Sequence, residues 1–465
     1  MNRLSRWILG LGSAPLAALV FPPFGFDGFG IPFLAVFAWL PLLLSLHGST
    51  AKENVYRGFI HGFIFYAITF SWFTALFANL AVILWLILAT FSALTCWGLH
   101  FLISKKDKLG TMGVACLGAS LWVGFEFLRG EVYFLKFPWM TPGMGMGPTW
   151  WHPLLGVYAS TFLIVFSGIT LSFWRKKPTM AQWTGLLLAV TCLLSIRSPL
   201  VGAGQRDDSS GIPVLAVQAL HPEADESQVA AIEFGAKFIV WPEYSRPGDA
   251  RRIPFVRRSL EALATNAQAT LILGTTTDLP GGENYNTALS IGESGILGEH
   301  HKNHPVHFFD DGKIGPNALP ISTPLGKVGT SICFDNDYQD TALSMTQNGA
   351  EFFLVPSLDA VSWTLREHLQ HSDLARHRAA ENHREFVVAS GQGITQHIDA
   401  QGRRVAALPQ PDPGMLTTKV IPHRDLTFFT QYGWLFGWVN LGVTGIIVLW
   451  LLVEKFKKRR VAKSA

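Results

Sequence analysis

The chain has 465 residues, of which 49% are hydrophobic and only 15% charged, and it carries 16 Trp and 34 Phe. This composition is too apolar for one soluble domain, and the chain is too long for a single hydrophobic core. The formal net charge is only +4, so nothing in the charge balance indicates a nucleic-acid partner.

Apolar residues are concentrated in 1–200 and 433–453, whereas 205–425 holds nearly all of the Asp and Glu. Runs long enough to cross ~30 Å of hydrocarbon lie at 7–22, 30–46, 58–78, 80–103, 111–128, 153–174, 181–199 and 433–453. The sequence therefore predicts an N-terminal transmembrane domain of about seven spans (1–200), an extracytoplasmic domain (205–425), a C-terminal transmembrane helix (433–453) and a basic cytoplasmic tail (454–465).

Alternate loops of the apolar half are basic. The positive residues of these loops are Arg3, Arg6, Lys52, Arg57, Lys105, Lys106, Lys108, Arg175, Lys176 and Lys177. The positive-inside rule puts these loops and the basic tail in the cytoplasm. An odd number of preceding spans then places 205–425 on the outer face of the membrane.

The segment between the fifth and sixth runs holds Glu126, Arg129 and Trp139. An ionisable group near a span is costly and usually has a partner, and Arg129 shares a helical face with Glu126. One interpretation is a lipid-facing entrance supported by this pair. The alternative is an aromatic belt at the membrane interface, where Trp and Tyr are common.

From residue 213 the pattern changes to strands that alternate with amphipathic helices. Strands are predicted at 214–218, 237–241, 270–275, 287–291, 328–332, 352–356, 386–390 and 393–398, and helices at 226–234, 251–268 and 363–382. Alternating β and α segments indicate a layered α/β domain.

Three polar residues lie at strand ends or in irregular segments of this domain. Cys333 follows the run 328–332, Glu243 follows 237–241, and Lys302 lies in a stretch that is predicted to be irregular. A carboxylate can act as general base for a thiol, and an ammonium can stabilise a thiolate or an oxyanion. The three residue types therefore form an acyl-transfer set. Taken singly, each has a plainer interpretation, a buried structural thiol or an ordinary surface charge.

The histidines at 300, 301, 304 and 307 suggest a metal cluster, but Pro305 argues against a helix that would align them. We interpret them as titrating loop residues. Neither a metal nor a cofactor is expected.

With these residues in place, the chain resembles the apolipoprotein N-acyltransferases, a membrane-embedded family of the nitrilase superfamily. The markers are Glu126 and Arg129 followed by 137–139, then 217–218, 241–243, 285–287, Lys302, 332–333, 378–381, 393–394 and Asp399. The resemblance implies a multispan α-helical membrane domain joined to a nitrilase-like αββα sandwich. It also implies Glu243 as base, Lys302 as stabiliser and Cys333 as nucleophile.

The flanks of the trio depart from the family pattern. Asp310 stands where the family has a glutamate after its lysine, and Phe334 and Asp335 replace the usual tyrosine and glutamate after the cysteine. We take these three as supporting residues, together with Glu126, Arg129 and Trp139. Phe308, Phe309 and Phe334 are near Cys333 in sequence, which predicts an apolar, water-excluding setting for the thiol.

The resemblance implies an acyltransferase that moves a fatty acyl chain from a membrane phospholipid, through a thioester on Cys333, to the α-amine of a diacylglyceryl-cysteine lipoprotein. The chain is expected to act as a monomer. Two alternatives stay open at this point: a membrane-anchored amidase or an acyltransferase with another amine acceptor, and a catalytically silent scaffold that binds lipid or lipoprotein.

Overall fold

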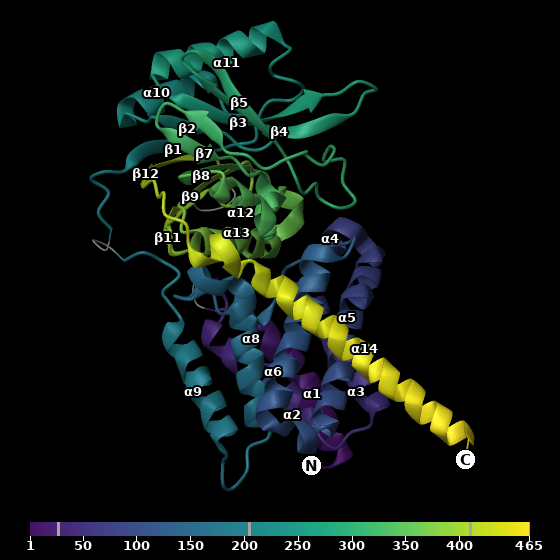
Figure 1. Cartoon of the computed structure of the whole chain (residues 1–465). Helices are drawn as coiled ribbons and strands as arrows, with labels where there is room; N and C mark the ends of the chain where they lie inside the picture. Colours follow the sequence, from purple (N-terminus) through teal and green to yellow (C-terminus); the bar gives the residue numbers. More distant parts are fainter. Residues whose placement is uncertain (26–27, 203–205, 409–411, 465) are drawn as a thin grey trace. The chain divides into compact units, whose positions relative to one another are not determined.

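The computed structural model describes residues 1–25, 28–202, 206–408 and 412–464, with side chains for all of these except 458–464. The chain divides into two compact units, Met1–Arg197 with Gly433–Ala465, and Ser198–Tyr432. We call them the helical unit and the α/β unit, and Figure 1 shows their secondary structure.

The helical unit contains helices of very different lengths. They are α1 (Arg3–Ala18), α2 (Leu40–Ser45), α3 (Ala51–Thr69), α4 (Phe73–Phe77), α5 (Ala81–Ser104), α6 (Lys106–Phe127), α7 (Pro142–Gly145), α8 (His152–Ser172), α9 (Met180–Ser195) and α14 (Leu435–Ser464). Short 3₁₀ or π turns follow or precede several of these, at Pro32–Val36, Ala78–Leu80, Leu128–Val132 and Phe429–Gly433.

Four stretches of the described chain are long and apolar enough to cross a membrane, by length and composition: Phe73–Ser104, Lys106–Val132, His152–Ser172 and Phe429–Lys457. They coincide with the predicted spans at 80–103, 111–128, 153–174 and 433–453. The chain therefore has several apolar helices that are candidates for membrane spans.

The other four predicted runs form shorter or more polar helices. Run 30–46 is divided because Pro32 opens a 3₁₀ turn and Pro41 opens the short helix α2. Run 58–78 lies partly in α3, which begins early, at a capping box between Thr50 and Glu53, and so takes charged residues into its first turns. Helices α1 and α9 overlap runs 7–22 and 181–199, and the number of spans stays a prediction.

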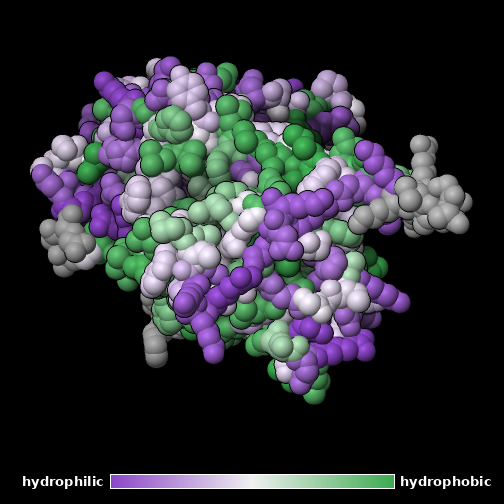
Figure 2. Space-filling view, turned by 60° about the horizontal axis from the view of Figure 1, so that its bottom comes forward, coloured by the Kyte–Doolittle hydropathy of each residue, from purple (hydrophilic) through white to green (hydrophobic). Residues whose placement is uncertain are grey.

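Large apolar side chains point outward from α5, α9 and α14. Ile83 of α5, Leu187 of α9 and Ile446 of α14 are all more than half exposed. Figure 2 shows broad apolar areas on the face it presents, with hydrophilic side chains between them. Such exposure is costly in water and is the surface that lipid tails cover.

The α/β unit holds two six-stranded sheets. The first has the order β12-β1-β2-β3-β4-β5 and the second β11-β10-β9-β8-β7-β6. The strands are β1 (Ile212–Gln218), β2 (Phe238–Val240), β3 (Thr270–Asp278), β4 (Asn284–Gly292), β5 (Gly295–His301), β6 (Ile321–Thr323), β7 (Gly326–Gly329), β8 (Phe352–Ser357), β9 (Phe386–Ser390), β10 (Gln396–Ile398), β11 (Arg404–Ala407) and β12 (Gly414–Val420). The central strands β1, β2 and β3 run parallel, as do β7, β8 and β9.

Alternating side chains on these strands build a four-layer sandwich. On β1, Val214 and Ala216 face a cluster that also contains Phe352 and Leu354 of β8, so this cluster fills the space between the sheets. The residues between them, such as Leu215, point to the other face of the sheet and pack against the helices that cover it. Successive strand residues point to opposite faces, which explains why both faces of each sheet are apolar.

Four longer helices cover the outer faces of the two sheets. They are α10 (Ala224–Phe234), α11 (Pro254–Ala267), α12 (Asp340–Gln347) and α13 (Thr364–Asn382). Apolar residues of α10 and α11 pack on the first sheet and those of α12 and α13 on the second. The predicted αββα sandwich is therefore confirmed.

Candidate active site

Cys333 begins a 3₁₀ turn, Cys333–Asp337, just beyond the end of β7. Its backbone lies in the left-handed region, with φ +46°, a conformation that costs a non-glycine residue about 1–3 kcal/mol. Its side chain is buried, and Sγ lies 3.8 Å from the carbonyl oxygen of Leu358. A strained turn at a strand end presents a nucleophile in one fixed orientation.

Lys302 stands at the centre of a buried group of charges. It follows β5, and its Nζ donates to Glu243 Oε1 at 2.8 Å and contacts Asp311 Oδ2 at 2.7 Å. Asn286 of β4 binds the same two carboxylates through Nδ2, at 2.6 Å from Glu243 Oε1 and 2.8 Å from Asp311 Oδ1. An ammonium has three N–H donors, so the two carboxylates leave one donor of Lys302 for a substrate oxygen.

The charges in this group fix the protonation states. Burial raises the pKa of Glu243 above the ordinary carboxyl value, although the charge of Lys302 opposes the increase. Burial alone would lower the pKa of Lys302, but the charges of Glu243 and Asp311 outweigh it and keep that pKa well above the usual value. Burial and the charge of Glu243 raise the pKa of the Cys333 thiol, and Lys302 and His371 act against this. These directions favour the thiol form of Cys333 and make Glu243 more basic than an ordinary carboxylate.

An acidic partner of Lys302 is Asp311, whereas the sequence analysis singled out its neighbour Asp310 as a supporting residue. The Asp310 side chain is exposed, while that of Asp311 is buried, accepts from the Tyr244 hydroxyl at 2.8 Å and accepts from the backbone of Val306 at 2.8 Å. Adjacent carboxylates on an irregular loop point in different directions, and only one of them can face the ammonium. The structure therefore brings Asp311 rather than Asp310 into contact with Lys302, and a supporting role for Asp310 stays a prediction.

Asp335 joins the segment of Lys302 to that of Cys333. Its Oδ1 accepts from the backbone nitrogens of Asn303 at 2.9 Å and His304 at 2.8 Å, and its Oδ2 accepts from the backbone nitrogen of Ile332 at 3.0 Å. His300 also contacts Oδ2, at 3.1 Å. Asp335, which the sequence analysis took as a supporting residue, thus holds the backbone beside both Lys302 and Cys333.

The setting of Cys333 is charged rather than apolar. Phe334 is buried and packs edge-on against Tyr338, with ring centroids 5.4 Å apart. Phe308 and Phe309, however, are 66% and 41% exposed. These two rings are therefore not buried against the thiol, and the predicted exclusion of water from Cys333 stays a prediction.

Glu126, Arg129 and Trp139 lie in the helical unit. Arg129 donates to the carbonyl oxygens of Phe137 at 2.7 Å and Trp139 at 3.0 Å, so it fixes the loop that follows α6. Trp139 is 1% exposed and stacks on Phe137, with ring centroids 5.1 Å apart. This burial differs from the interfacial aromatic belt that the sequence also suggested.

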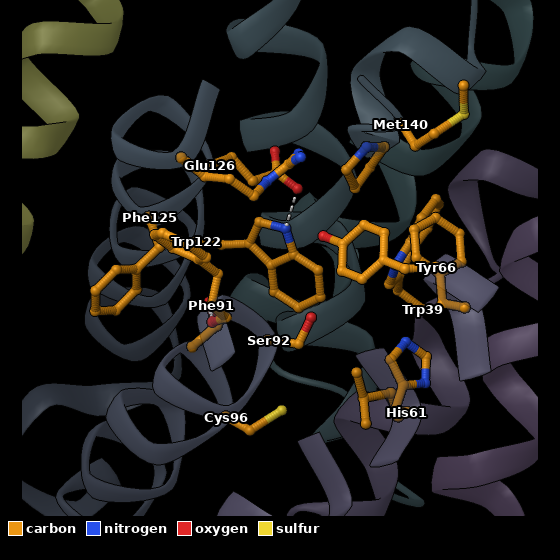
Figure 3. A pocket seen from close by; sticks show the side chains of 15 residues that line it. Trp39, His61, Tyr66, Phe91, Ser92, Cys96, Trp122, Phe125, Glu126 and Met140 are labelled. Atoms are coloured by element: carbon orange, nitrogen blue, oxygen red, sulfur yellow. Dashed lines mark hydrogen bonds between the residues drawn. The ribbon is translucent and has the colours of Figure 1, made fainter. Parts of the chain in front are cut away.

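Glu126 lines a small cavity within the helical unit, shown in Figure 3, and accepts from Trp122 Nε1 at 2.8 Å. Tyr66 and His61 line other parts of the same cavity. The cavity volume is about 40 Å³, and one water needs at least roughly 10–15 Å³. The space takes a few waters rather than a lipid chain, so an entrance role for Glu126 stays a prediction.

His300 and His301 belong to strand β5, whereas the sequence analysis expected them to lie in a loop. Among the described residues, two sets of three side chains bring possible metal ligand atoms within 4.8 Å of one another. They are Cys333, Asp359 and His371, and His383, His423 and Asp425. Neither set includes a histidine of 300–307, and the absence of a metal stays an expectation.

Sequence reasoning gave no site role to Asn286, Asp311, His371 or Asp359. Asn286 was visible only as part of a family marker at 285–287, and its distance from Glu243 in the chain gave no sign of contact. His371 on α13 and Asp359 after β8 meet because the helix packs on the second sheet. No spacing in the sequence predicts that contact.

Gly274 of β3 provides a test of how closely Glu243 must be positioned. A Cβ at residue 274 would lie 2.3 Å from the Cα of Glu243 and 2.6 Å from the backbone nitrogen of Tyr244. Gly274→Ala should therefore displace Glu243 and lower turnover by about 10²-fold, with a loss of stability of about 1–3 kcal/mol. Turnover and thermal unfolding of the variant measure both effects.

Gly414→Ala is the matched control, because the added Cβ in strand β12 meets nothing nearer than a flexible Leu408 side chain at 3.3 Å. Wild-type turnover in Gly274→Ala would show that the position of Glu243 is not critical.

A two-sheet αββα sandwich with a glutamate, a lysine and a cysteine close to its strand ends defines an enzyme of the nitrilase type. The family model described as carbon-nitrogen hydrolase matches residues 174–424, which is more than half of the chain. A second model, described as apolipoprotein N-acyltransferase N-terminal domain, matches residues 13–170.

Full-length relatives agree with both matches. An apolipoprotein N-acyltransferase of Pseudomonas aeruginosa is 28% identical over 96% of this chain and 96% of its own length. One from Vibrio vulnificus is 23% identical over 95% and 96%. The crystal structure of an amidase from Nesterenkonia sp. is 18% identical over 50% of this chain and 96% of its own, with a TM-score of 0.40. The chain belongs to the carbon-nitrogen hydrolase family and, within it, to the apolipoprotein N-acyltransferases. It is thus an acyltransferase.

Proposed function

We propose that the enzyme takes a fatty acyl chain from a membrane phospholipid, holds it as a thioester on Cys333, and passes it to the α-amine of a lipoprotein whose N-terminal cysteine carries diacylglycerol. The observation that carries this proposal is the buried contact of Lys302 with both Glu243 and Asp311, in electrostatic range of the Cys333 thiol. The names of the relatives support a lipoprotein as acceptor.

In the first half-reaction, Cys333 Sγ attacks the ester carbonyl of the phospholipid. The thiol proton passes to Glu243 as the S–C bond forms. The remaining N–H donor of Lys302 stabilises the oxyanion of the tetrahedral intermediate. The C–O bond then breaks, and the proton on Glu243 moves to the leaving oxygen, which departs as the hydroxyl of a lysophospholipid.

In the second half-reaction, the neutral α-amine of the lipoprotein attacks the thioester carbonyl. The N–C bond forms, and Glu243 accepts a proton from the amine. The C–S bond breaks, and that proton returns to Sγ. The products are an amide and the free Cys333 thiol, so Glu243 finishes the cycle in its original state.

Substrates of this kind belong to the bilayer, which agrees with the four apolar helices of the helical unit. We propose that the chain is a multi-pass protein of the bacterial inner membrane with residues 205–425 on the periplasmic face. The basic loops and the basic tail support this orientation. A monomer suffices for the chemistry, because Glu243, Lys302, Asp311 and Cys333 all come from one chain.

A chase experiment distinguishes transfer from hydrolysis. The enzyme is first acylated with phospholipid carrying a labelled acyl chain, freed of excess lipid, and divided into two samples. One sample receives a diacylglyceryl-cysteine peptide and the other receives buffer. We expect rapid transfer of label to the peptide and slow release into buffer, as for an acyl-enzyme on a two-step path.

A diacylglyceryl-cysteine peptide with an acetylated α-amine is the control acceptor, since it lacks the nucleophile. Release of free fatty acid at the same rate in buffer and with the free-amine peptide would contradict the proposal and favour a hydrolase.

A further inference from the structure

A second charged group lies beside the Cys333 thiol, formed by residues with no part in the mechanism above. The Cys333 sulfur, one carboxylate oxygen of Asp359 and one ring nitrogen of His371 all lie within 4.8 Å of one another. All three side chains are at least nine-tenths buried. Water therefore screens the charges of this group little.

Both ring nitrogens of His371 face carboxylates. Nδ1 lies 2.7 Å from Asp359 Oδ1, and Nε2 lies 3.3 Å from Asp337 Oδ1. Nδ1 is within hydrogen-bonding distance of Asp359, and Nε2 is within ion-pair distance of Asp337. A positive charge on the ring is therefore stabilised by both carboxylates. This arrangement between two carboxylates suits the protonated ring.

Other charged groups around the ring are consistent with this assignment. Burial alone would lower the pKa of His371, but the charges of Asp359 and Asp337 outweigh it and hold that pKa well above the usual value. Burial, together with the nearby Asp359, raises the pKa of Glu367 on the same helix. His368 Nε2 contacts the carbonyl oxygen of Ala360 at 2.9 Å.

We propose that His371, held as an imidazolium by Asp337 and Asp359, is a positioning residue that provides a second positive charge for the Cys333 thiolate, in addition to Lys302. This inference rests on the proposed role of Cys333 as nucleophile.

The geometry explains why a second cation is needed. Lys302 is shared between Glu243 and Asp311, so its charge is already offset by two carboxylates. His371 and Asp359 both lie near the sulfur, and the lowering effect of His371 on the pKa of Cys333 is larger than the raising effect of Asp359. The imidazolium thus favours the thiolate form, and its removal would leave two carboxylates without their cation.

Alkylation of Cys333 tests this directly, because iodoacetamide reacts with the thiolate and needs no lipid substrate. The full chain is purified in detergent, and modification of the Cys333 peptide is followed by mass spectrometry over a range of pH. In His371→Gln we expect the midpoint to rise by about one to three pH units. At a fixed pH of about 8, the alkylation rate should then fall by about tenfold or more.

Two variants distinguish the effect of the positive charge at residue 371 from a structural effect of the substitution. His371→Lys keeps a cation at the same place and should restore a midpoint close to that of the wild type. His377→Gln is the matched control, since His377 is a buried histidine of the same helix, and should alkylate like the wild type. If His371→Gln does not fold, His371→Asn provides a smaller neutral replacement for the same comparison.

An unchanged midpoint in the folded neutral variant would overturn the inference. A rise of equal size in His377→Gln, or in His371→Lys, would overturn it as well, since the effect would then be structural. If the midpoint moves as expected but wild-type Cys333 takes no acyl group from phospholipid, the proposed function fails while the role of His371 stands.

Discussion

Replacing Cys333 by alanine is expected to abolish acyl transfer, with a loss on the order of 10⁴- to 10⁶-fold. The reason is that the variant lacks the sulfur that must carry the acyl group between the two substrates. Stability should stay close to that of the wild type, because alanine at residue 333 meets the same left-handed backbone, φ +46°, that cysteine already adopts. Turnover with phospholipid and lipopeptide, together with thermal unfolding, measures both.

Cys116→Ala is the control, because Cys116 is an exposed cysteine of helix α6. It should transfer acyl groups at the wild-type rate. Substantial activity in Cys333→Ala would end the thioester mechanism, whatever the control shows.

Glu243→Gln should lower turnover by about 10²- to 10⁴-fold, the usual cost of losing a general base. The amide keeps the shape of the side chain, and Lys302 keeps its contact with Asp311, so the fold should survive. Wild-type turnover should fall as the pH decreases through the pKa of Glu243, which burial raises above the ordinary carboxyl value. The variant should lack that limb of the pH profile.

Glu283→Gln provides the comparison, because Glu283 is an exposed carboxylate that pairs with Lys313. A pH profile of Glu243→Gln that matches the wild type would exclude Glu243 as the base. Lys302→Met is a less clean test, since it leaves Glu243 and Asp311 buried without their cation, which typically costs about 3–5 kcal/mol of stability.

The layered α/β domain was predictable because its central strands are short, apolar and bounded by clear turns. The strand predicted at 386–390 is β9 itself, and 214–218 lies within β1. Strand β5 was missed because it lies at a sheet edge, where most of its residues are partly exposed and no alternation marks it. Lys302 was therefore assigned to an irregular stretch, although it directly follows that strand.

The residues of the site likewise include some that the sequence predicted and some that it did not. Residue type at a strand end was enough to single out Glu243 and Cys333. It did not distinguish Asp310 from Asp311, because the direction of a side chain on a loop depends on backbone angles that sequence does not give. His371 and Asp359 lay beyond prediction, since their contact arises only when α13 packs on the second sheet.

The thioester on Cys333 is tested most directly by mass spectrometry of the purified chain after incubation with phospholipid alone. The wild type should gain the mass of one acyl chain, located on the Cys333 peptide and released by hydroxylamine, as expected of a thioester. Cys333→Ala should gain nothing. An unmodified wild-type Cys333, or an acyl group on another residue in both proteins, would contradict the account.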